Sequence, residues 1–365
     1  MEPIDLAFRV RRCPIPTPPL YGRGFCAALL LVLLAACARP ASPGVTELTY
    51  ATPYGPNHPF SRADKAWMEF VAAKSGGSLR IVPSWSGALL SADMSMEELR
   101  HGVADIGLIT PIYVKGGAHL IRIQAGFYSG ADSVESQIAL YRCIAGANPQ
   151  VARELDGLKV LAIQGGSLPG VVTTERPVRS LADLKGLRLR APTELLSVLG
   201  ALGADPVNMP MGEVYSALTK GVIDGVVAPA DTFGAMHFAE VARHFNTIAV
   251  PRGAYPARAM GMARWRRLKP QQQAVFEAAM PVWEAALAKE IRAALAKGMD
   301  EARARGVTIA AMPKSEQARF DALYLREAEA NARALARFGI DGMKAFRTAR
   351  ASVPARDRIA CGGAS

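Results

Sequence analysis

Residues that bind metals are scarce and scattered in this sequence. It has five histidines, His58, His101, His119, His237 and His244, and their spacing is not that of metal ligands. The five cysteines include no C-x-x-C pair. We therefore expect neither a structural nor a catalytic metal, and no motif indicates a cofactor.

Familiar catalytic motifs are also missing. There is no H-E-x-x-H pair and no G-x-S-x-G elbow. Ser167 comes nearest, in GGSLPG, but Pro169 stands where the second glycine of an elbow is required. These absences argue against an enzyme.

Acidic residues are too few to balance the basic ones, and the formal net charge is +11. Of this excess, +9 falls in residues 258–365, as arginines interleaved with glutamates, a pattern typical of solvated helix faces. Residues 37–257 are neutral, with 19 basic and 19 acidic side chains. Since no aromatic-interleaved basic stretch accompanies the charge, we expect no nucleic-acid partner.

Long apolar runs are absent except near the N-terminus. Four arginines precede the run Phe25–Ala36, which is too short to span a bilayer comfortably. It ends in Leu-Ala-Ala-Cys, and small residues before a cysteine resemble a bacterial lipoprotein signal. Residues 1–36 would then be the signal peptide, Cys37 the lipidated first residue of a periplasmic, membrane-anchored protein, and residues 37–45 a tether. The alternative is ordinary cleavage at an A-x-A-like site, with Cys37 as an incidental thiol.

Two cysteines remain in the body of the chain. Cys143 falls on the apolar face of a predicted helix, Ser133–Ala145, where a small buried residue suffices to explain it. A disulfide with Cys361 is compatible with export into an oxidising compartment. The sequence leaves both alternatives open.

Strand and helix patterns alternate along the mature chain. The first predicted strands are Thr46–Thr52, Leu79–Pro83 and Asp105–Ile109, with helices over Ser61–Lys74 and Met96–His101 between them. Such a βαβαβ unit forms a parallel sheet whose strand-end loops meet at one edge. These loops place Asn57, His58, Trp85 and Thr110 at that edge.

A second set of elements follows a predicted crossover. The segment Gln164–Gly170 is rich in glycine, and Arg252–Pro256 has the composition of a return crossover. A long alanine-rich helix is predicted over Pro270–Arg305 and is long enough to run across two small domains. The pattern predicts an α/β protein of two lobes, joined by crossover strands and bridged by that helix.

Arg190 is the strongest candidate for a binding residue. In the predicted strand Leu187–Arg190 apolar and basic residues alternate, and Pro192 forces the chain to turn. Arg190 therefore stands at the carboxyl end of a strand, where α/β sheets bind small ligands. A guanidinium there can hold a carboxylate through two hydrogen bonds. The alternative is a surface arginine paired with Glu194.

The residues around Arg190 resemble a known family. The segments that show this resemblance are DLKGLRLRAP (183–192), LGADPVNMPM (202–211), EVY (213–215) and GVIDG (221–225). They are similar to the solute-binding subunits of tripartite ATP-independent periplasmic (TRAP) transporters, the DctP-like family, over about Thr46 to Met343. The resemblance implies a two-lobed periplasmic-binding-protein-like fold. Lobe I would comprise residues 46–166 plus 254–295, and lobe II residues 167–253 plus 296–360.

The family also implies a binding site and partners. The arginine of its R-x-P motif, here Arg190, binds the ligand carboxylate in a cleft between the lobes. Two membrane subunits, one small and one large, then receive the ligand. Further candidates for the cleft are Asn57, His58, Trp85, Thr110, Met209, Met211, Ala228, Asp231 and Tyr255. For Asn57 and His58 the alternative, of equal weight, is that they serve only their own loop, and Asp231 and Tyr255 are expected at the rim.

Two departures from the family pattern bear on the ligand. Ala228 stands where some members have asparagine, and a second basic residue that some members carry near Gly170 is absent. We therefore expect one carboxylate on Arg190 and an apolar remainder beside Trp85, Met209 and Phe233. An aromatic or branched keto or hydroxy monocarboxylate fits better than a dicarboxylate such as succinate. A ligand sensor for a membrane receptor and an exported enzyme remain alternative functions.

Overall fold

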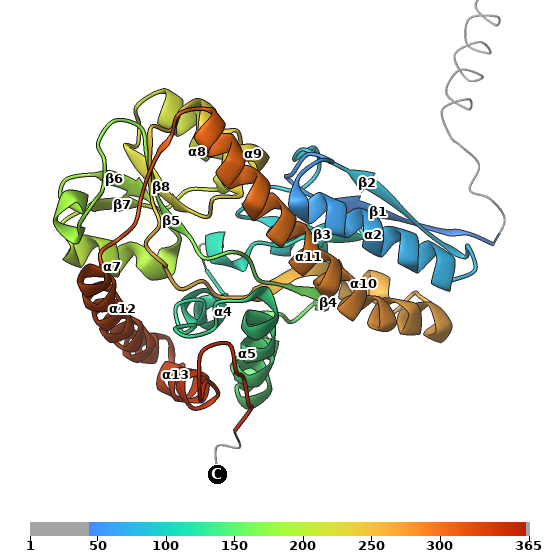
Figure 1. Cartoon of the computed structure of the whole chain (residues 1–365). Coiled ribbons are helices and arrows are strands. Elements are labelled where there is room, and N and C mark those ends of the chain that lie inside the picture. Colours follow the sequence, from blue (N-terminus) through green and yellow to red (C-terminus); the bar gives the residue numbers. More distant parts are fainter. Residues whose placement is uncertain (1–43, 115, 363–365) are drawn as a thin grey trace, which may run out of the picture. The chain divides into compact units, whose positions relative to one another are not determined.

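Two β-sheets flanked by helices make up the fold (Figure 1). The computed structural model describes residues 44–114 and 116–362, and residues from Val45 onwards form one compact unit. The predicted signal peptide, Cys37 and nearly all of the predicted tether lie outside the described residues. In the described part, no helix combines the length and apolar character needed to cross a bilayer.

The first sheet has the strand order β2-β1-β3-β10-β4. Its strands are β1 (Thr46–Ala51), β2 (Leu79–Ser84), β3 (Ile106–Leu108), β4 (Leu158–Gln164) and β10 (Tyr255–Gly261). Strand β1 lies parallel to both β2 and β3, whereas β10 runs antiparallel to β3 and β4. The predicted βαβαβ unit is therefore present, with α2 (Pro59–Lys74) and α3 (Ser95–Arg100) as its helices.

The second sheet has the order β11-β9-β5-β8-β6-β7. Its strands are β5 (Gly170–Thr173), β6 (Arg188–Arg190), β7 (Asp205–Val207), β8 (Gly225–Ala228), β9 (His244–Asn246) and β11 (Thr308–Ala310). Strand β6 lies parallel to β7 and β8, between them. The carboxyl end of β6, with Arg190, is thus held on both sides.

Short helices fill the connections. They are η1 (Pro111–Tyr113), α4 (His119–Gln124), α5 (Val134–Ala147), α6 (Pro149–Glu154), η2 (Leu181–Leu184), η3 (Thr193–Leu195), α7 (Leu196–Ala201), α8 (Met211–Thr219), α9 (Thr232–Ala235), η4 (Phe238–Glu240), α10 (Met262–Trp265) and η5 (Leu335–Phe338). Residues 193–201, which follow Arg190 and Pro192, form the two consecutive helices η3 and α7. Thr193 caps neither of them, because its hydroxyl instead donates to the carbonyl of Ile112 at 3.3 Å.

The chain passes from the first sheet to the second between β4 and β5 and returns between β9 and β10. The two crossings run beside each other, and the N–H of Val250 donates to the carbonyl of Pro169 at 3.0 Å. Gly253 lies so close to α4 that a Cβ there would be 2.4 Å from the Cα of Ala125. Because these crossings connect the two sheets, they lie where a hinge between the two halves would have to be.

Helix α11 (Pro270–Ala304) joins the two halves (Figure 1). Its 35 residues extend about 50 Å. Along that length it packs against α2 and β4 of the first half and against α9 of the second. The predicted bridging helix is therefore present.

The C-terminal segment departs from the expected boundaries. Helix α12 (Lys314–Ala334) packs against α7, but α13 (Gly342–Ala351) packs against α5, on the first half. Three apolar side chains of α13, those of Ala345, Phe346 and Ala349, join the core around the first sheet. Residues 296–360 therefore do not all belong with the second half, because the apolar face of α13 is covered by α5.

Candidate functional site

Two adjoining cavities lie between the sheets. An outer cleft of about 1170 Å³ opens to solvent, and an inner pocket of about 100 Å³ lies behind it. Six residues line both: Tyr54, His58, Tyr113, Met211, Asp231 and Met236. The first three come from the first half and the others from the second, so a molecule in the inner pocket would contact both.

Arg190 lines the inner pocket and is 4% exposed. Its Nε donates to the carbonyl of Met209 at 3.0 Å, and its Nη2 donates to the hydroxyl of Tyr113 at 2.6 Å. Its guanidinium carbon lies 5.8 Å from the centre of the Tyr113 ring. Arg190 is therefore fixed by one contact from each half, and it is not the exposed partner of Glu194 that the alternative interpretation required.

Arg252, which was not among the predicted site residues, brings a second guanidinium to the inner pocket. It lies in the return crossing and packs on Gly166 of the other crossing, where a Cβ would be 2.4 Å from its Cζ. Its Nη1 donates to the carbonyl of Ser167 at 3.4 Å. The position near Gly170 does lack a basic residue, but the pocket gains one from elsewhere. A charged residue between Pro251 and Gly253, inside a predicted crossover, was the available signal.

Glu194 and Asp231 place two carboxyl groups in the same inner pocket. Both are buried, and in each one oxygen, Oε2 of Glu194 and Oδ1 of Asp231, has no hydrogen-bond partner among the described residues. Burial raises the pKa of Glu194 to about 7, against the opposing effects of Arg190 and Arg252. It raises the pKa of Asp231 to about 6. Asp231 therefore forms part of the pocket wall, whereas it was expected at the rim.

His58 and Tyr255 line the inner pocket as neutral groups. The Nδ1 of His58 accepts from the N–H of Phe60 at 3.2 Å, which caps α2, and its ring stacks on Tyr54 with centroids 4.0 Å apart. Burial, assisted by Arg258 and Arg62, lowers the pKa of His58 to about 3. His58 thus serves its own loop and also lines the cavity.

Tyr255 accepts a hydrogen bond from the Nε2 of Gln164 at 2.8 Å. Burial raises the pKa of Tyr255 to about 12. Tyr255 lies inside the pocket and not at the rim, where it was expected.

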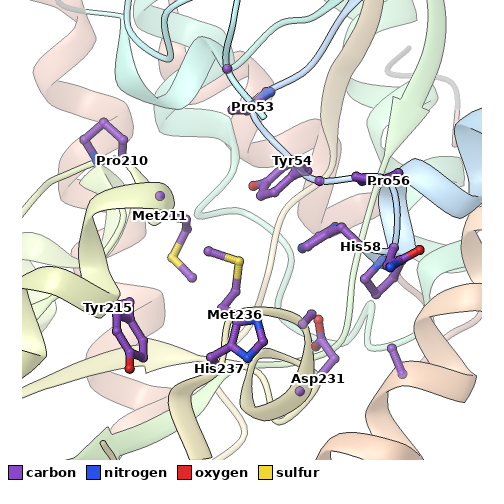
Figure 2. Close-up of a pocket in the computed structure, with 18 of the residues that line it drawn as sticks. Pro53, Tyr54, Pro56, His58, Pro210, Met211, Tyr215, Asp231, Met236 and His237 are labelled. Atoms are coloured by element: carbon purple, nitrogen blue, oxygen red, sulfur yellow. The ribbon is translucent and has the colours of Figure 1, made fainter. Parts of the chain in front are cut away.

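Two methionines from the second half provide flexible apolar surface. The side chains of Met211, at the start of α8, and Met236, after α9, point into the cavity opposite Tyr54 and His58 (Figure 2). Met209 instead packs partly buried against the core of the second half, and only its carbonyl reaches Arg190. One of the two predicted methionines therefore faces the cleft, as expected, and the other does not.

Three expected cavity residues lie elsewhere. Trp85 lines neither cavity and packs edge-on against Tyr50, with ring centroids 6.0 Å apart. It follows β2, the edge strand farthest from the crossings. Phe233 is fully buried against Phe245, and Ala228 is buried in β8. The prediction of a wall made by Trp85, Met209 and Phe233 was therefore wrong.

Asn57 and Thr110 line only the outer cleft. The carbonyl of Asn57 accepts from Nη1 of Arg62, and the hydroxyl of Thr110 donates to the carbonyl of Ala92. Both residues therefore support the loops at the mouth.

Comparison with known proteins identifies the family. Residues 50–329 match the model of "bacterial extracellular solute-binding protein, family 7", or DctP. The chain belongs to this family. A TRAP solute binding protein from Rhodoferax ferrireducens T118, solved with copurified benzoate, is similar to it with a TM-score of 0.78 and 25% identity, over 84% of this chain and 97% of that one.

Curated relatives match shorter stretches of the chain. A solute-binding protein of Roseobacter denitrificans is 34% identical over 119 residues, 32% of this chain and 36% of its own length. The 2,3-diketo-L-gulonate-binding periplasmic protein of Escherichia coli K12 is 29% identical over 170 residues, 45% of this chain and 51% of its own length. This chain thus spans about a third of the length of the first relative and about half of the length of the second.

Proposed function

We propose that the chain is the extracytoplasmic receptor of a TRAP transporter, which captures a small organic acid between its two halves and delivers it to two membrane subunits. The observation that carries this proposal is the position of Arg190. Its Nε and Nη2 are held by protein groups, and in the described part of the chain its Nη1 has no protein partner. A carboxylate bound there would be neutralised in a buried place, where a charge-assisted hydrogen bond is strong. The proposal gives the chain no catalytic step.

The lining supports an acid with a compact apolar remainder. Next to Arg190, the inner pocket offers Ile112, Leu195, Met211 and Met236, together with the stacked rings of Tyr54 and His58. An aromatic or branched monocarboxylate, such as benzoate or a 2-hydroxy or 2-oxo acid, fills such a surface better than succinate does. The benzoate of the Rhodoferax protein belongs to this class.

We further propose that ligand binding closes lobe I (residues 46–166 and 254–295) on lobe II (residues 167–253 and the region from 296 that packs on the second sheet). The two crossings and the contacts of Arg190 with both halves support this. Closure would remove water from around the carboxylate and strengthen its hydrogen bonds.

Replacing Arg190 with glutamine tests the proposed function. The uncharged amide cannot neutralise a carboxylate, so we expect affinity for benzoate or (R)-mandelate to fall by about 100-fold or more. Isothermal titration calorimetry measures this change. Succinate should bind the native protein more weakly than both acids.

Arg188→Gln is the matched control. Arg188 lies on the same strand but is exposed and pairs with Asp205 at 2.9 Å. Its loss should leave the affinity unchanged. Equal affinities of the Arg190→Gln variant and the native protein would contradict the proposed role of Arg190.

The predicted anchor is proposed on sequence grounds. The run Phe25–Ala36 followed by Cys37 supports cleavage before Cys37 and attachment of lipid to its thiol. Mass spectrometry of the protein from membranes should find a mature chain that begins at Cys37 and carries acyl chains. An unmodified N-terminus at another residue would exclude the anchor.

A further inference from the structure

Two acidic side chains in the inner pocket have no part in holding a carboxylate. Glu194 and Asp231 line the pocket together with Arg190 and Arg252. Each is buried and has one oxygen without a partner among the described residues. A carboxylate would not be left unpaired in such a place without cost, because burying an unsatisfied charge is unfavourable.

The charges in the pocket indicate that one further positive charge is needed when an anion binds. With both acids ionised, the two guanidinium groups are balanced before any ligand arrives. An organic anion would then add one uncompensated negative charge to a buried site. One proton on either acid removes this excess and turns that carboxyl into a hydrogen-bond donor.

Resting on the proposed function, we propose that the pocket binds a monocarboxylate together with one proton, which is held on Glu194 or Asp231. The neutral acid then donates its hydrogen bond to the ligand. Arg190 holds the ligand carboxylate, and Arg252 compensates whichever acid stays ionised. The unpaired oxygens are the atoms available for these bonds.

The other ionisable groups around the two acids are not candidates to take up this proton, so Glu194 and Asp231 remain as its sites. Glu194 faces Arg190 on β6, Arg252 in the return crossing, Tyr255 on β10 and Tyr324 on α12. Asp231 faces Arg252. Burial raises the pKa of both tyrosines, which stay neutral below pH 10, and the arginines stay charged.

His58, which lines the same pocket, is neutral at physiological pH because burial lowers its pKa to about 3. Among the described neighbours, the two acids therefore titrate nearest neutral pH, Glu194 with a pKa of about 7 and Asp231 with a pKa of about 6.

The proposal fixes the direction in which ligand affinity depends on pH. Binding an anion favours the protonated acid, so protons are taken up and the affinity falls as the pH rises above the pKa of the free acid. The loss approaches tenfold per pH unit for one coupled proton. Well below the pKa of the acid that holds the proton, where the proton is already present, the affinity should level off.

Calorimetry with benzoate and (R)-mandelate tests the proposal. Both are fully ionised from pH 5.5 to 8, so any proton taken up must go to the protein. Titrations at pH 7.5 in buffers of different ionisation enthalpy should show an uptake approaching one proton per ligand. The dissociation constant should rise several-fold between pH 7 and pH 8.

Isosteric variants locate the proton. Glu194→Gln and Asp231→Asn each place a neutral side chain in the pocket, and the variant at the proton-holding residue should lose both proton uptake and pH dependence. Glu175→Gln is the control, because Glu175 is exposed and outside both cavities. That variant should keep both properties.

The outcomes separate the two proposals. Binding without proton uptake, or pH dependence that persists in both pocket variants, would overturn the proton proposal and leave carboxylate capture intact. Failure of the native protein to bind either acid at any pH would overturn both. Carbon-13 titration of the protein with and without benzoate follows each acid directly: if neither Glu194 nor Asp231 has a higher pKa in the complex than in the free protein, the proton proposal is overturned.

Discussion

At the scale of single residues, the pocket depends on a charged cluster buried beneath it. Asp64 of α2 and Arg258 of β10 form an ion pair with both side chains fully buried, and Nε of Arg258 lies 2.7 Å from Oδ1 of Asp64. Arg258 also donates to Gln164 at 3.1 Å, and Gln164 in turn donates to Tyr255 in the pocket wall. One chain of hydrogen bonds thus leads from the core of the first half to the ligand site.

Asp64 is satisfied on every side. Besides Arg258, it accepts from the hydroxyl of Tyr50 at 2.6 Å and from Nε1 of Trp283 at 2.8 Å. The guanidinium of Arg258 lies 4.5 Å from the centre of the Trp283 ring. A carboxylate with two charged oxygens is the only common group of this size that accepts from all these donors.

Asp64→Asn should therefore destabilise the protein strongly. The amide leaves the positive charge of Arg258 uncompensated in a buried place, and its NH₂ faces donors. We expect the free energy of unfolding to fall by about 3–5 kcal/mol, measured by urea denaturation.

Glu69→Gln is the control for this prediction. Glu69 lies on the same helix but is exposed, so its change should stay within about 0.5 kcal/mol. A loss of less than about 1 kcal/mol in Asp64→Asn would show that the pair contributes little.

At the scale of elements, the long bridging helix also shapes the pocket. Gly298 of α11 lies against the loop before α9, where a Cβ would be only 2.0 Å from the carbonyl oxygen of Ala230. Since Ala230 precedes Asp231, the helix supports the backbone that carries a pocket acid. Only glycine allows so close a contact.

Much of the element order was predictable from the sequence. Apolar alternation predicted β1 and β6, and the long alanine-rich pattern predicted α11 nearly to the residue. These elements bury a continuous face, and such a face leaves a period in the sequence. Strand β11 was missed because three residues, partly exposed at a sheet edge, leave no such period.

The pocket was predictable only in part. Arg190 could be placed because a strand and a proline fix its position. Arg252 and Glu194 could not be placed in the pocket, because the sequence of a crossover or of a 3₁₀ turn does not show in which direction a side chain points. Trp85 was wrongly placed because the edge position of its strand is a property of the sheet order. Which strand ends reach the cleft is decided by tertiary packing, not by local pattern.

At the scale of the whole molecule, the C-terminal segment ties the two halves together. Strand β11 completes the second sheet, α12 packs on α7, and α13 returns to α5 of the first half (Figure 1). The segment that follows α13 is then fastened to α5 twice. Asp357 accepts from the backbone N–H groups of Asp132 and Ser133, each at 2.8 Å, and Cys361 forms a disulfide with Cys143.

The disulfide decides the alternative that the sequence left open. It joins residues 218 positions apart, so it closes a long loop in the unfolded chain and lowers the entropy of the unfolded state. It also holds α13 on α5, where the apolar face of α13 would otherwise depend on packing alone. In the proposed closure, the C-terminus would stay fixed to the first half.

Removing the disulfide should weaken the whole fold and leave the pocket formed. For the double variant Cys143→Ser, Cys361→Ser we expect a loss of about 2–4 kcal/mol in the free energy of unfolding, measured by urea denaturation. Dithiothreitol should move the native protein to the variant's curve and leave the variant unchanged. Affinity for benzoate should stay the same, because the disulfide lies outside the residues that line the pocket. Superimposable unfolding curves of native protein and variant would show that packing of α13 on α5 alone holds the C-terminus.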